Sequence, residues 1–222
     1  QGGFGRVYRA CDPQLDRLLA LKVPTFSSQD GNKAQRFQSE AKAAAQLRHP
    51  NIVPTFESGK IGNQYFIASQ FIDGKSLSEI IKSGSVDTRK AAQWVSRIAH
   101  ALAYAHDMGI VHRDVKPHNV MLDARGEPQL MDFGLAKRMN EDSGMTTEGS
   151  LLGTPAYMAP EQARGGIAHI GPHSDQYAVG AILYELLTGR RAFEGSPHTV
   201  IGEILSSEPK SPRSINPQIP ID

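Results

Sequence analysis

Residues 112–119 constrain this chain more than any other stretch. Their order is His-Arg-Asp-Val-Lys-Pro-His-Asn, so a carboxylate, an ammonium group and a carboxamide lie close together along the chain. Lys116 follows Asp114 by two positions, and Asn119 follows it by five. Such a group of side chains fits either a functional loop or a solvated turn with mixed charges. The motifs elsewhere in the chain decide between these two interpretations.

A second acidic segment lies eighteen positions after Asp114, where Asp132 begins the sequence Asp-Phe-Gly. The intervening chain has short apolar runs at residues 120–122 and 128–131, with a turn at Gly126 between them. This pattern predicts a hairpin. We expect the hairpin to bring both carboxylates to one cleft.

The first 72 residues have the pattern of a small antiparallel sheet with one helix. Strands are expected at residues 6–10, 18–23, 52–57 and 64–71. Residues 32–48 carry apolar side chains at helical spacing, which predicts one long helix between the second and third strands.

From Gly74 onward the apolar period becomes helical. Helices are expected at residues 76–82, 87–108, 174–188 and 197–206. Ser76 is a candidate N-cap, and Gly109 is expected to end the second helix. The proline-rich remainder after residue 206 is expected to be an extended connector. The fold class is therefore α+β, with a small sheet followed by a mainly helical region.

Composition bounds the possibilities. A chain of 222 residues can form one large domain or two small lobes. Its net charge of +1 gives no sign of a dedicated nucleic-acid or membrane-surface binder. The single Cys11 fits a reducing compartment or a thiol-poor exported protein. The longest apolar run, residues 177–187, is interrupted by Glu185 and is too short to span a bilayer.

Three segments together resemble the protein kinases. Residues 112–119, 132–134 and 153–161 resemble the H-R-D, D-F-G and A-P-E motifs of that family. Lys116 resembles the serine/threonine-specific branch, and Met-Ala-Pro-Glu-Gln-Ala at residues 158–163 resembles bacterial, Hanks-type members.

The resemblance implies a two-lobed α+β kinase fold covering most of a kinase domain. An N-lobe at residues 1–72 would end in a hinge at residues 70–72, and residues 73–222 would form a helical C-lobe. The last helices would be missing, including the arginine that normally pairs with Glu161. The helix at residues 174–188 resembles the buried kinase helix whose aspartate, here Asp175, would brace the backbone of residues 112–119. The implied activity is ATP-dependent phosphorylation of serine or threonine in proteins.

The resemblance also assigns the catalytic and metal-binding residues. Asp114 would orient the substrate hydroxyl and accept its proton, while Lys116 would contact the transferred phosphate. Asn119 and Asp132 would hold Mg²⁺ through oxygen atoms, which this cation prefers. These assignments add a metal cofactor, Mg²⁺, to ATP.

Nucleotide binding is assigned in the same way. Lys22 ends Leu-Ala-Leu-Lys at residues 19–22, so it would contact the α- and β-phosphates and pair with Glu40 of the first long helix. The other implied nucleotide contacts are Gly2, Gly5, Val7, Ala20, Gln70, Ile72, Asp73, Met121 and Asp132. Gly2 and Gly5 equally fit an ordinary turn, and Asp73 with Gly74 equally fits a plain turn. The small Ser69 is expected to leave a pocket open behind the adenine.

A polar run at residues 140–150 separates the second and third motifs. It reads as a surface loop. A sharper hypothesis is that a phosphate on Thr146 or Thr147 pairs with Arg113 and switches activity on. Thr154 would hydrogen-bond to the catalytic aspartate and lysine, as the resemblance implies.

Partners and alternatives complete the expectations. The implied partners are ATP, protein substrates and a second copy for trans-autophosphorylation, but no nucleic acid. The kinase domain is expected in the cytoplasm, with membrane tethering of the full-length protein left open. Two rival functions remain: a pseudokinase-like nucleotide-binding scaffold and a small-molecule kinase of similar fold. Non-catalytic relatives usually lack a counterpart of one of five residues, which are all present in this chain: Lys22, Glu40, Asp114, Asn119 and Asp132.

Overall fold

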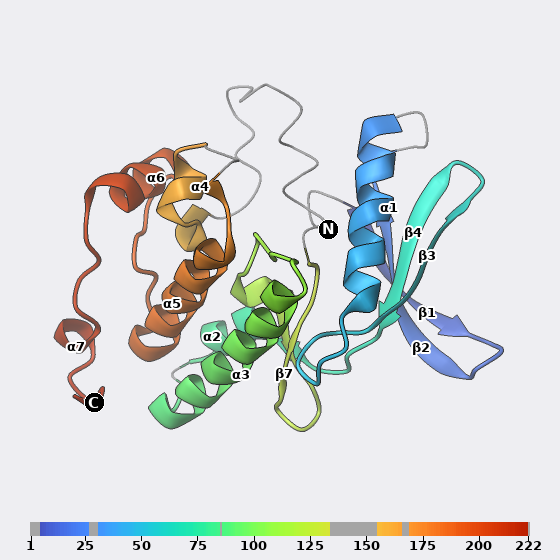
Figure 1. Cartoon of the computed structure of the whole chain (residues 1–222). Coiled ribbons are helices and arrows are strands. Elements are labelled where there is room, and N and C mark those ends of the chain that lie inside the picture. Colours follow the sequence, from blue (N-terminus) through green and yellow to red (C-terminus); the bar gives the residue numbers. More distant parts are fainter. Residues whose placement is uncertain (1–4, 27–30, 85, 134–154, 166–168, 222) are drawn as a thin grey trace.

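The computed structural model describes residues 5–26, 31–84, 86–133, 155–165 and 169–221, without the side chains of residues 31–36 and 40. It has a sheet-rich part followed by a mainly helical part (Figure 1). This is the two-lobed α+β arrangement that the sequence predicts.

The sheet-rich part is one antiparallel sheet in the strand order β1-β2-β4-β3. The strands are β1 Gly5–Asp12, β2 Arg17–Pro24, β3 Thr55–Ile61 and β4 Gln64–Gln70. The first hairpin is closed by Asp12, whose carboxylate accepts hydrogen bonds from the backbone of Gln14 and Leu15 and from the side chain of Arg17. Such a local turn favours the register of β1 and β2 before any long-range contact forms.

Helix α1, Gly31–Gln46, packs beside this sheet (Figure 1). Its buried Phe37 and Ala41 meet Tyr65 and Ile67 of β4 in a small apolar core. Phe26 closes the core through an edge-on contact with Phe37, with ring centroids 5.5 Å apart. The helix is therefore anchored to the sheet through one face, as its apolar spacing predicts.

The helical part contains the larger core. Its helices are α2 Leu77–Ser83, α3 Thr88–Asp107, α4 Pro160–Ala163, α5 Pro172–Thr188, α6 Pro197–Ser206 and α7 Pro212–Ile215. Helices α3 and α5 pack together, burying Ile98 and Leu102 of the first and Ile182 of the second. The starts of α2 and α3 are capped by Ser76 and Asp87, as expected of these residue types.

A small second sheet lies on the helical part and carries the central residues of the chain. It pairs β5 Lys75–Ser76 with β6 Val120–Leu122, and β6 with β7 Pro128–Leu130. The 3₁₀ turn η1, Pro117–Asn119, leads into β6. The predicted hairpin around Gly126 is confirmed, and it brings Asn119 next to the end of β7, where the backbone N–H of Met131 donates to the Asn119 carbonyl at 3.0 Å.

The segment between α1 and β3 holds the two parts together through backbone contacts with β7. Ile52 forms a parallel bridge with Leu130 of β7. The backbone N–H of Val53 donates to the Leu130 carbonyl, and the N–H of Leu130 donates to the Asn51 carbonyl. These bonds fix the sheet-rich part over the strand that precedes Asp132.

The structure corrects two expectations of secondary structure. The third strand begins at Thr55 rather than at residue 52, because Ile52 pairs with Leu130 instead of with β4. The connector after residue 206 contains the short helix α7, which is docked by a hydrogen bond from the Asn216 side chain to the Leu187 carbonyl of α5. Both corrections come from contacts between distant segments.

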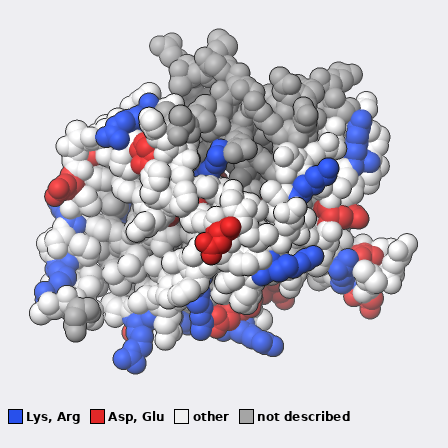
Figure 2. Space-filling model, in the orientation of Figure 1, with Lys and Arg blue, Asp and Glu red and all other residues white. Residues whose placement is uncertain are grey.

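The surface shows mixed charge. On the face drawn in Figure 2, Lys and Arg side chains are interspersed with Asp and Glu. Among the helices that the structure describes, none combines the length and the apolar character needed to cross a membrane.

Candidate functional site

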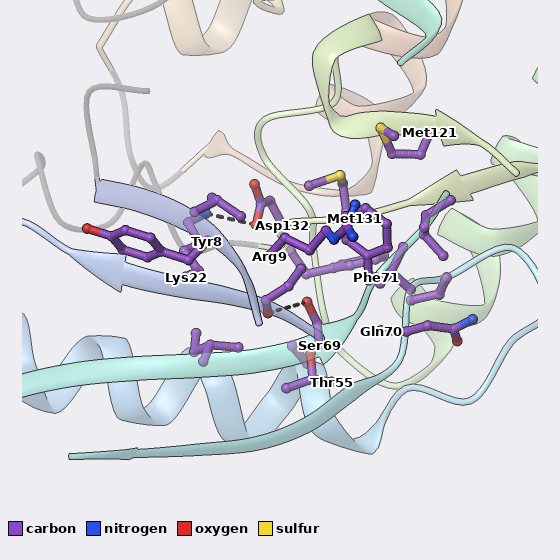
Figure 3. A pocket seen from close by; sticks show the side chains of 18 residues that line it. Tyr8, Arg9, Lys22, Thr55, Ser69, Gln70, Phe71, Met121, Met131 and Asp132 are labelled. Atoms are coloured by element: carbon purple, nitrogen blue, oxygen red, sulfur yellow. Dashed lines mark hydrogen bonds and ion pairs between the residues drawn. The ribbon is translucent and has the colours of Figure 1, made fainter. Parts of the chain in front are cut away.

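A cavity of about 400 Å³ lies between the sheet-rich part and the helical part. Figure 3 shows Tyr8, Arg9 and Lys22 of the first hairpin on one wall and Met121, Met131 and Asp132 of the helical part on the other. The lining is largely apolar and includes the charged side chains of Arg9, Lys22 and Asp132. This lining suits a flat apolar ring joined to a charged tail.

An ion pair links the two walls of the cavity. Lys22 Nζ lies 2.8 Å from Asp132 Oδ1, and both side chains are mostly buried (Figure 3). Asp132 has a positive φ of 65°, an unusual conformation for a residue other than glycine. The Lys22–Asp132 pair therefore joins strand β2 to the end of the β6–β7 hairpin across the cleft.

Asp114 is held by its own loop. Its Oδ2 accepts hydrogen bonds from Lys116 Nζ at 2.7 Å and from Asn119 Nδ2 at 3.1 Å. Asn119 Nδ2 also donates to the Asp114 carbonyl at 2.8 Å. Because both bonds use the amide nitrogen, the amide oxygen of Asn119 is the atom that can ligate a cation.

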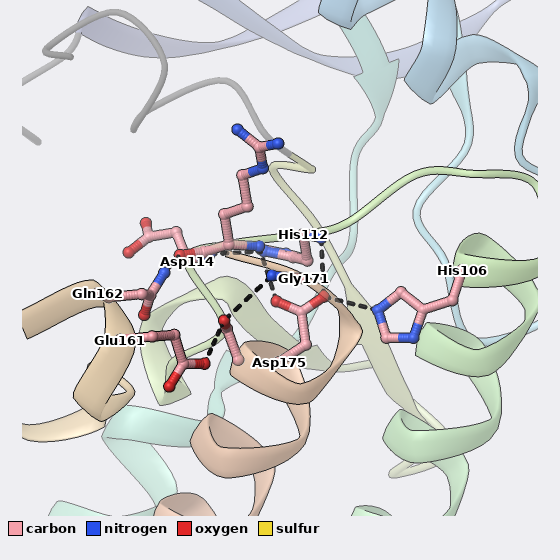
Figure 4. A network of polar contacts seen from close by, with 9 residues as sticks. His106, His112, Asp114, Glu161, Gln162, Gly171 and Asp175 are labelled. Atoms are coloured by element: carbon pink, nitrogen blue, oxygen red, sulfur yellow. Dashed lines mark hydrogen bonds and ion pairs between the residues drawn. The ribbon is translucent and has the colours of Figure 1, made fainter. Parts of the chain in front are cut away.

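The backbone before Asp114 is tied to α5. Buried Asp175 accepts hydrogen bonds from the N–H groups of His112 at 2.8 Å and Arg113 at 2.7 Å (Figure 4). Arg113 has a positive φ of 68°. The Asp175 carboxylate thus stabilises a backbone conformation that costs on the order of 1 kcal/mol or more in a residue with a side chain.

Two further side chains complete this network. His106 Nε2 lies 2.8 Å from Asp175 Oδ2, and Gln162 Nε2 donates to the Arg113 carbonyl at 2.9 Å. The sequence analysis assigned neither residue a role. Nothing local marks either residue, because their partners lie 69 and 49 positions away along the chain.

Glu161 is contacted by the first turn of α5. Its carboxylate accepts a hydrogen bond from Ser174 Oγ at 2.5 Å, and His173 Nε2 lies 3.3 Å away. The pairing of Glu161 with an arginine, which the resemblance implies, stays a prediction. Within the described residues, α5 already supplies contacts to this carboxylate.

The structure brings together most of the predicted nucleotide contacts. The members that line the cavity are Val7, Ala20, Lys22, Gln70, Ile72, Met121 and Asp132. Gly5 and Asp73 do not line it. Gly5 lies against β2, where a Cβ atom would come within 2.4 Å of the Val23 carbonyl oxygen.

Several other expectations fall on parts that the structure leaves undescribed. Gly2, Thr146, Thr147 and Thr154 lie outside the described residues, as does the side chain of Glu40. The expected pairing of Lys22 with Glu40 therefore stays a prediction.

The family is shown by comparison with known proteins. The family model described as "Protein kinase domain" matches residues 1–217. The chain belongs to the protein kinase family.

Its relatives include bacterial serine/threonine kinases. The chain is 39% identical to the serine/threonine-protein kinase PrkC of Bacillus subtilis, over 99% of this chain and 34% of that protein. It is 38% identical to the probable serine/threonine-protein kinase PknB of Lactococcus lactis, over 99% of this chain and 35% of that protein. The chain thus spans about a third of the length of these curated relatives.

A solved structure shows the same fold. The PknI kinase domain of Mycobacterium tuberculosis superposes with a TM-score of 0.76 and 28% sequence identity, over 99% of this chain and 79% of that one. The two-lobed α+β arrangement is therefore that of a kinase domain.

Ser69 offers a direct test of the cavity. It lines the cavity, and its hydroxyl donates to the Ala20 carbonyl at 3.4 Å. We expect Ser69→Phe to weaken binding of bulky ATP-site ligands by about tenfold or more, because the ring would fill space that the serine leaves open. Calorimetric titration of the purified protein measures this. Ser58→Phe, on an exposed part of β3, is the control, and equal affinity of such ligands for wild type and Ser69→Phe would refute the prediction.

Proposed function

We propose that the protein containing this chain is a serine/threonine protein kinase that transfers the γ-phosphate of ATP to hydroxyl groups of proteins. The observation that carries the proposal is the position of Asp114, whose Oδ2 is held by both Lys116 and Asn119. This arrangement directs a carboxylate at an acceptor hydroxyl and keeps a cation beside it. Phosphoryl transfer depends mainly on such positioning and charge neutralisation.

The proposed reaction uses the loop as follows. Asp114 orients the substrate hydroxyl and accepts its proton as the oxygen attacks the γ-phosphorus. The bond from that phosphorus to the bridging oxygen breaks, and ADP leaves. Lys116 neutralises the negative charge of the phosphoryl group in transit.

Asn119 and Asp132 fit a magnesium ion. Both can supply hard oxygen donors, and the bond from the Met131 N–H to the Asn119 carbonyl brings the residue before Asp132 next to Asn119. Within the described residues, no three His, Cys, Asp or Glu side chains form a metal site by themselves. Mg²⁺ usually takes one or two protein ligands together with substrate phosphates, which is the number that Asn119 and Asp132 would supply. When bound, it would neutralise charge on the β- and γ-phosphates.

The remaining nucleotide contacts follow from the cavity. Lys22 would bind the α- and β-phosphates, with Glu40 as its partner when the site is filled. The adenine would lie between Val7 and Ala20 on one side and Met121 on the other, against the hinge at residues 70–72. Gly2 and Gly5 would let backbone N–H groups approach the phosphates, and Asp73 would accept from the ribose.

Regulation is part of the proposal. A phosphate on Thr146 or Thr147 would add charge that Arg113 can pair with, next to Asp114. Thr154 would contact Asp114 and Lys116. Such phosphorylation between two copies requires transient dimerisation. Because ATP is supplied in the cytoplasm, we propose that the domain acts there.

Transfer of labelled phosphate tests the proposed function. The full-length protein is incubated with ATP, Mg²⁺ and a generic protein substrate, and label is expected in serine and threonine of the substrate and of the protein itself. Nucleotide-dependent thermal stabilisation without any transfer would instead indicate a pseudokinase-like scaffold. Label found only in a small molecule would indicate a small-molecule kinase of similar fold.

A further inference from the structure

A second cavity, of about 610 Å³, lies in the helical part. It is lined by the end of α2, the 3₁₀ turn η3 Pro155–Tyr157, the chain that connects α5 to α6 and the adjoining turns of those two helices. Ile81, Phe193 and Val200 supply apolar wall, while the charged lining comes from Lys82, Arg190, Arg191, Glu185 and Glu194. The cavity is therefore suited to a side chain with an apolar stem and a charged end.

The carboxylate of Glu185 is already engaged. Its side chain is only 10% exposed, its Oε2 accepts the Tyr157 hydroxyl at 2.5 Å, and its Oε1 lies 3.6 Å from Arg191 Nε. Burial, together with the neighbouring carboxylate, raises the pKa of the Tyr157 hydroxyl well above its usual value, so this hydroxyl stays a donor to Glu185.

Pairing of Glu185 with Arg191 determines the sign of the remaining charge. With that pair neutralised, Lys82 and Arg190 face a single carboxylate, Glu194. Lys82, Arg190 and Glu194 are all exposed. An anionic group entering the cavity would thus meet an excess of positive charge.

Helix α2, which supplies Ile81 and Lys82 to the cavity, also contacts the loop of residues 112–119, because Ser78 Oγ lies 3.2 Å from His118 Nε2. Burial lowers the pKa of the His118 imidazole, and the charges of Lys116, Lys82 and Arg191 lower it further, against the opposite effect of Glu185. His118 therefore lies within electrostatic reach of Lys116, which donates a hydrogen bond to Asp114, and of Lys82 and Arg191 of the cavity.

We propose that this cavity is a substrate subsite that takes an aspartate or glutamate side chain lying a few residues from the phosphorylated serine or threonine. The inference rests on the proposed kinase function and adds the substrate class to it. Lys82 and Arg190 attract the carboxylate. Arg191 acts as a specificity-determining residue, because it cancels the Glu185 charge that would otherwise repel an acidic substrate.

Paired peptides test the proposal with the full-length protein. Each peptide has one acceptor serine and carries Glu, Gln or Lys in turn at the flanking positions. We expect Glu at one position to raise kcat/KM about fivefold over Gln, mainly through a lower KM, as partly exposed ion pairs contribute about 1 kcal/mol. The peptide with Lys at that position should have the lowest kcat/KM of the three.

Two variants assign the effect to the cavity. Arg191→Ala leaves Glu185 uncompensated, so the Glu-to-Lys ratio should fall to about one or below. Lys82→Ala removes an exposed cation without disturbing the core, and it should lower the ratio in the same direction. Arg125→Ala, on the exposed turn between β6 and β7, is the matched control and should leave the ratio unchanged.

The outcomes separate this inference from the proposed function. Transfer to peptides with no preference for Glu, or with a preference for Lys, would overturn the subsite while leaving the kinase function intact. A preference for Glu that survives in both Arg191→Ala and Lys82→Ala would also overturn it. Absence of transfer to every peptide and to the generic substrate would overturn the kinase function itself.

Discussion

Substitution of Asp114 by asparagine is expected to lower the rate of phosphoryl transfer by about 10²- to 10⁴-fold, the usual contribution of a general base. Asparagine has nearly the same shape as aspartate, and its amide oxygen can still accept from Lys116 or Asn119. It cannot take a proton from the acceptor hydroxyl. The loss should therefore appear in kcat, with nucleotide affinity almost unchanged.

Steady-state kinetics with labelled ATP, together with calorimetric titration of nucleotide, measure the effect of Asp114→Asn. Asp123→Asn is the matched control, because Asp123 only caps the β6–β7 turn by accepting from the backbone of Arg125 and Glu127. An asparagine oxygen can accept the same bonds. Transfer by Asp114→Asn within about threefold of wild type would contradict the assignment of Asp114 as the proton acceptor.

Substitution of Asp175 by asparagine is expected to affect both stability and activity. Asp175 is 1% exposed and accepts from His112, Arg113 and His106. One amide oxygen cannot replace two carboxylate oxygens, so a buried N–H group loses its acceptor. We expect a loss of about 2 to 4 kcal/mol in the free energy of unfolding, or a drop in Tm of about 4 to 16 °C.

Activity should fall with Asp175→Asn even well below its Tm, because the positive φ of Arg113 is no longer held and Asp114 follows directly. Differential scanning calorimetry and the transfer assay measure the two effects. Asp87→Asn is the control, since asparagine caps a helix as well as aspartate does and Asp87 caps α3. An unchanged Tm for Asp175→Asn would show that the buried carboxylate is not needed to hold the loop.

Much of the secondary structure could be predicted from local patterns. The starts of α2 and α3 follow from their N-cap residues, Ser76 and Asp87, and α6 has the predicted bounds. Helix caps act within a few residues, so they are visible in the sequence. The predicted start of β3 at residue 52 was wrong because Ile52 pairs with Leu130, which lies in the other part of the molecule.

The candidate site was predictable to a similar degree. Spacing identified Asp114, Lys116 and Asn119, which contact one another within a single loop. The resemblance to the protein kinases implied that Lys22 lies at the same cleft, and Lys22 lines the cavity. It did not predict that Lys22 contacts Asp132, because that contact depends on how the sheet-rich part sits over the helical part.

The amino-acid sequence by itself determined which chemical groups are available for the proposed phosphoryl transfer and how they are spaced, because the loop and the hairpin bring together residues that are close along the chain. Only the tertiary structure decided the contacts through which distant groups hold that loop and the charges that surround it. Asp175 meets His112 because α3 and α5 pack together. Likewise, Tyr157 meets Glu185 because η3 packs on α5. Such contacts join residues far apart in the sequence, and burial of apolar side chains brings them together.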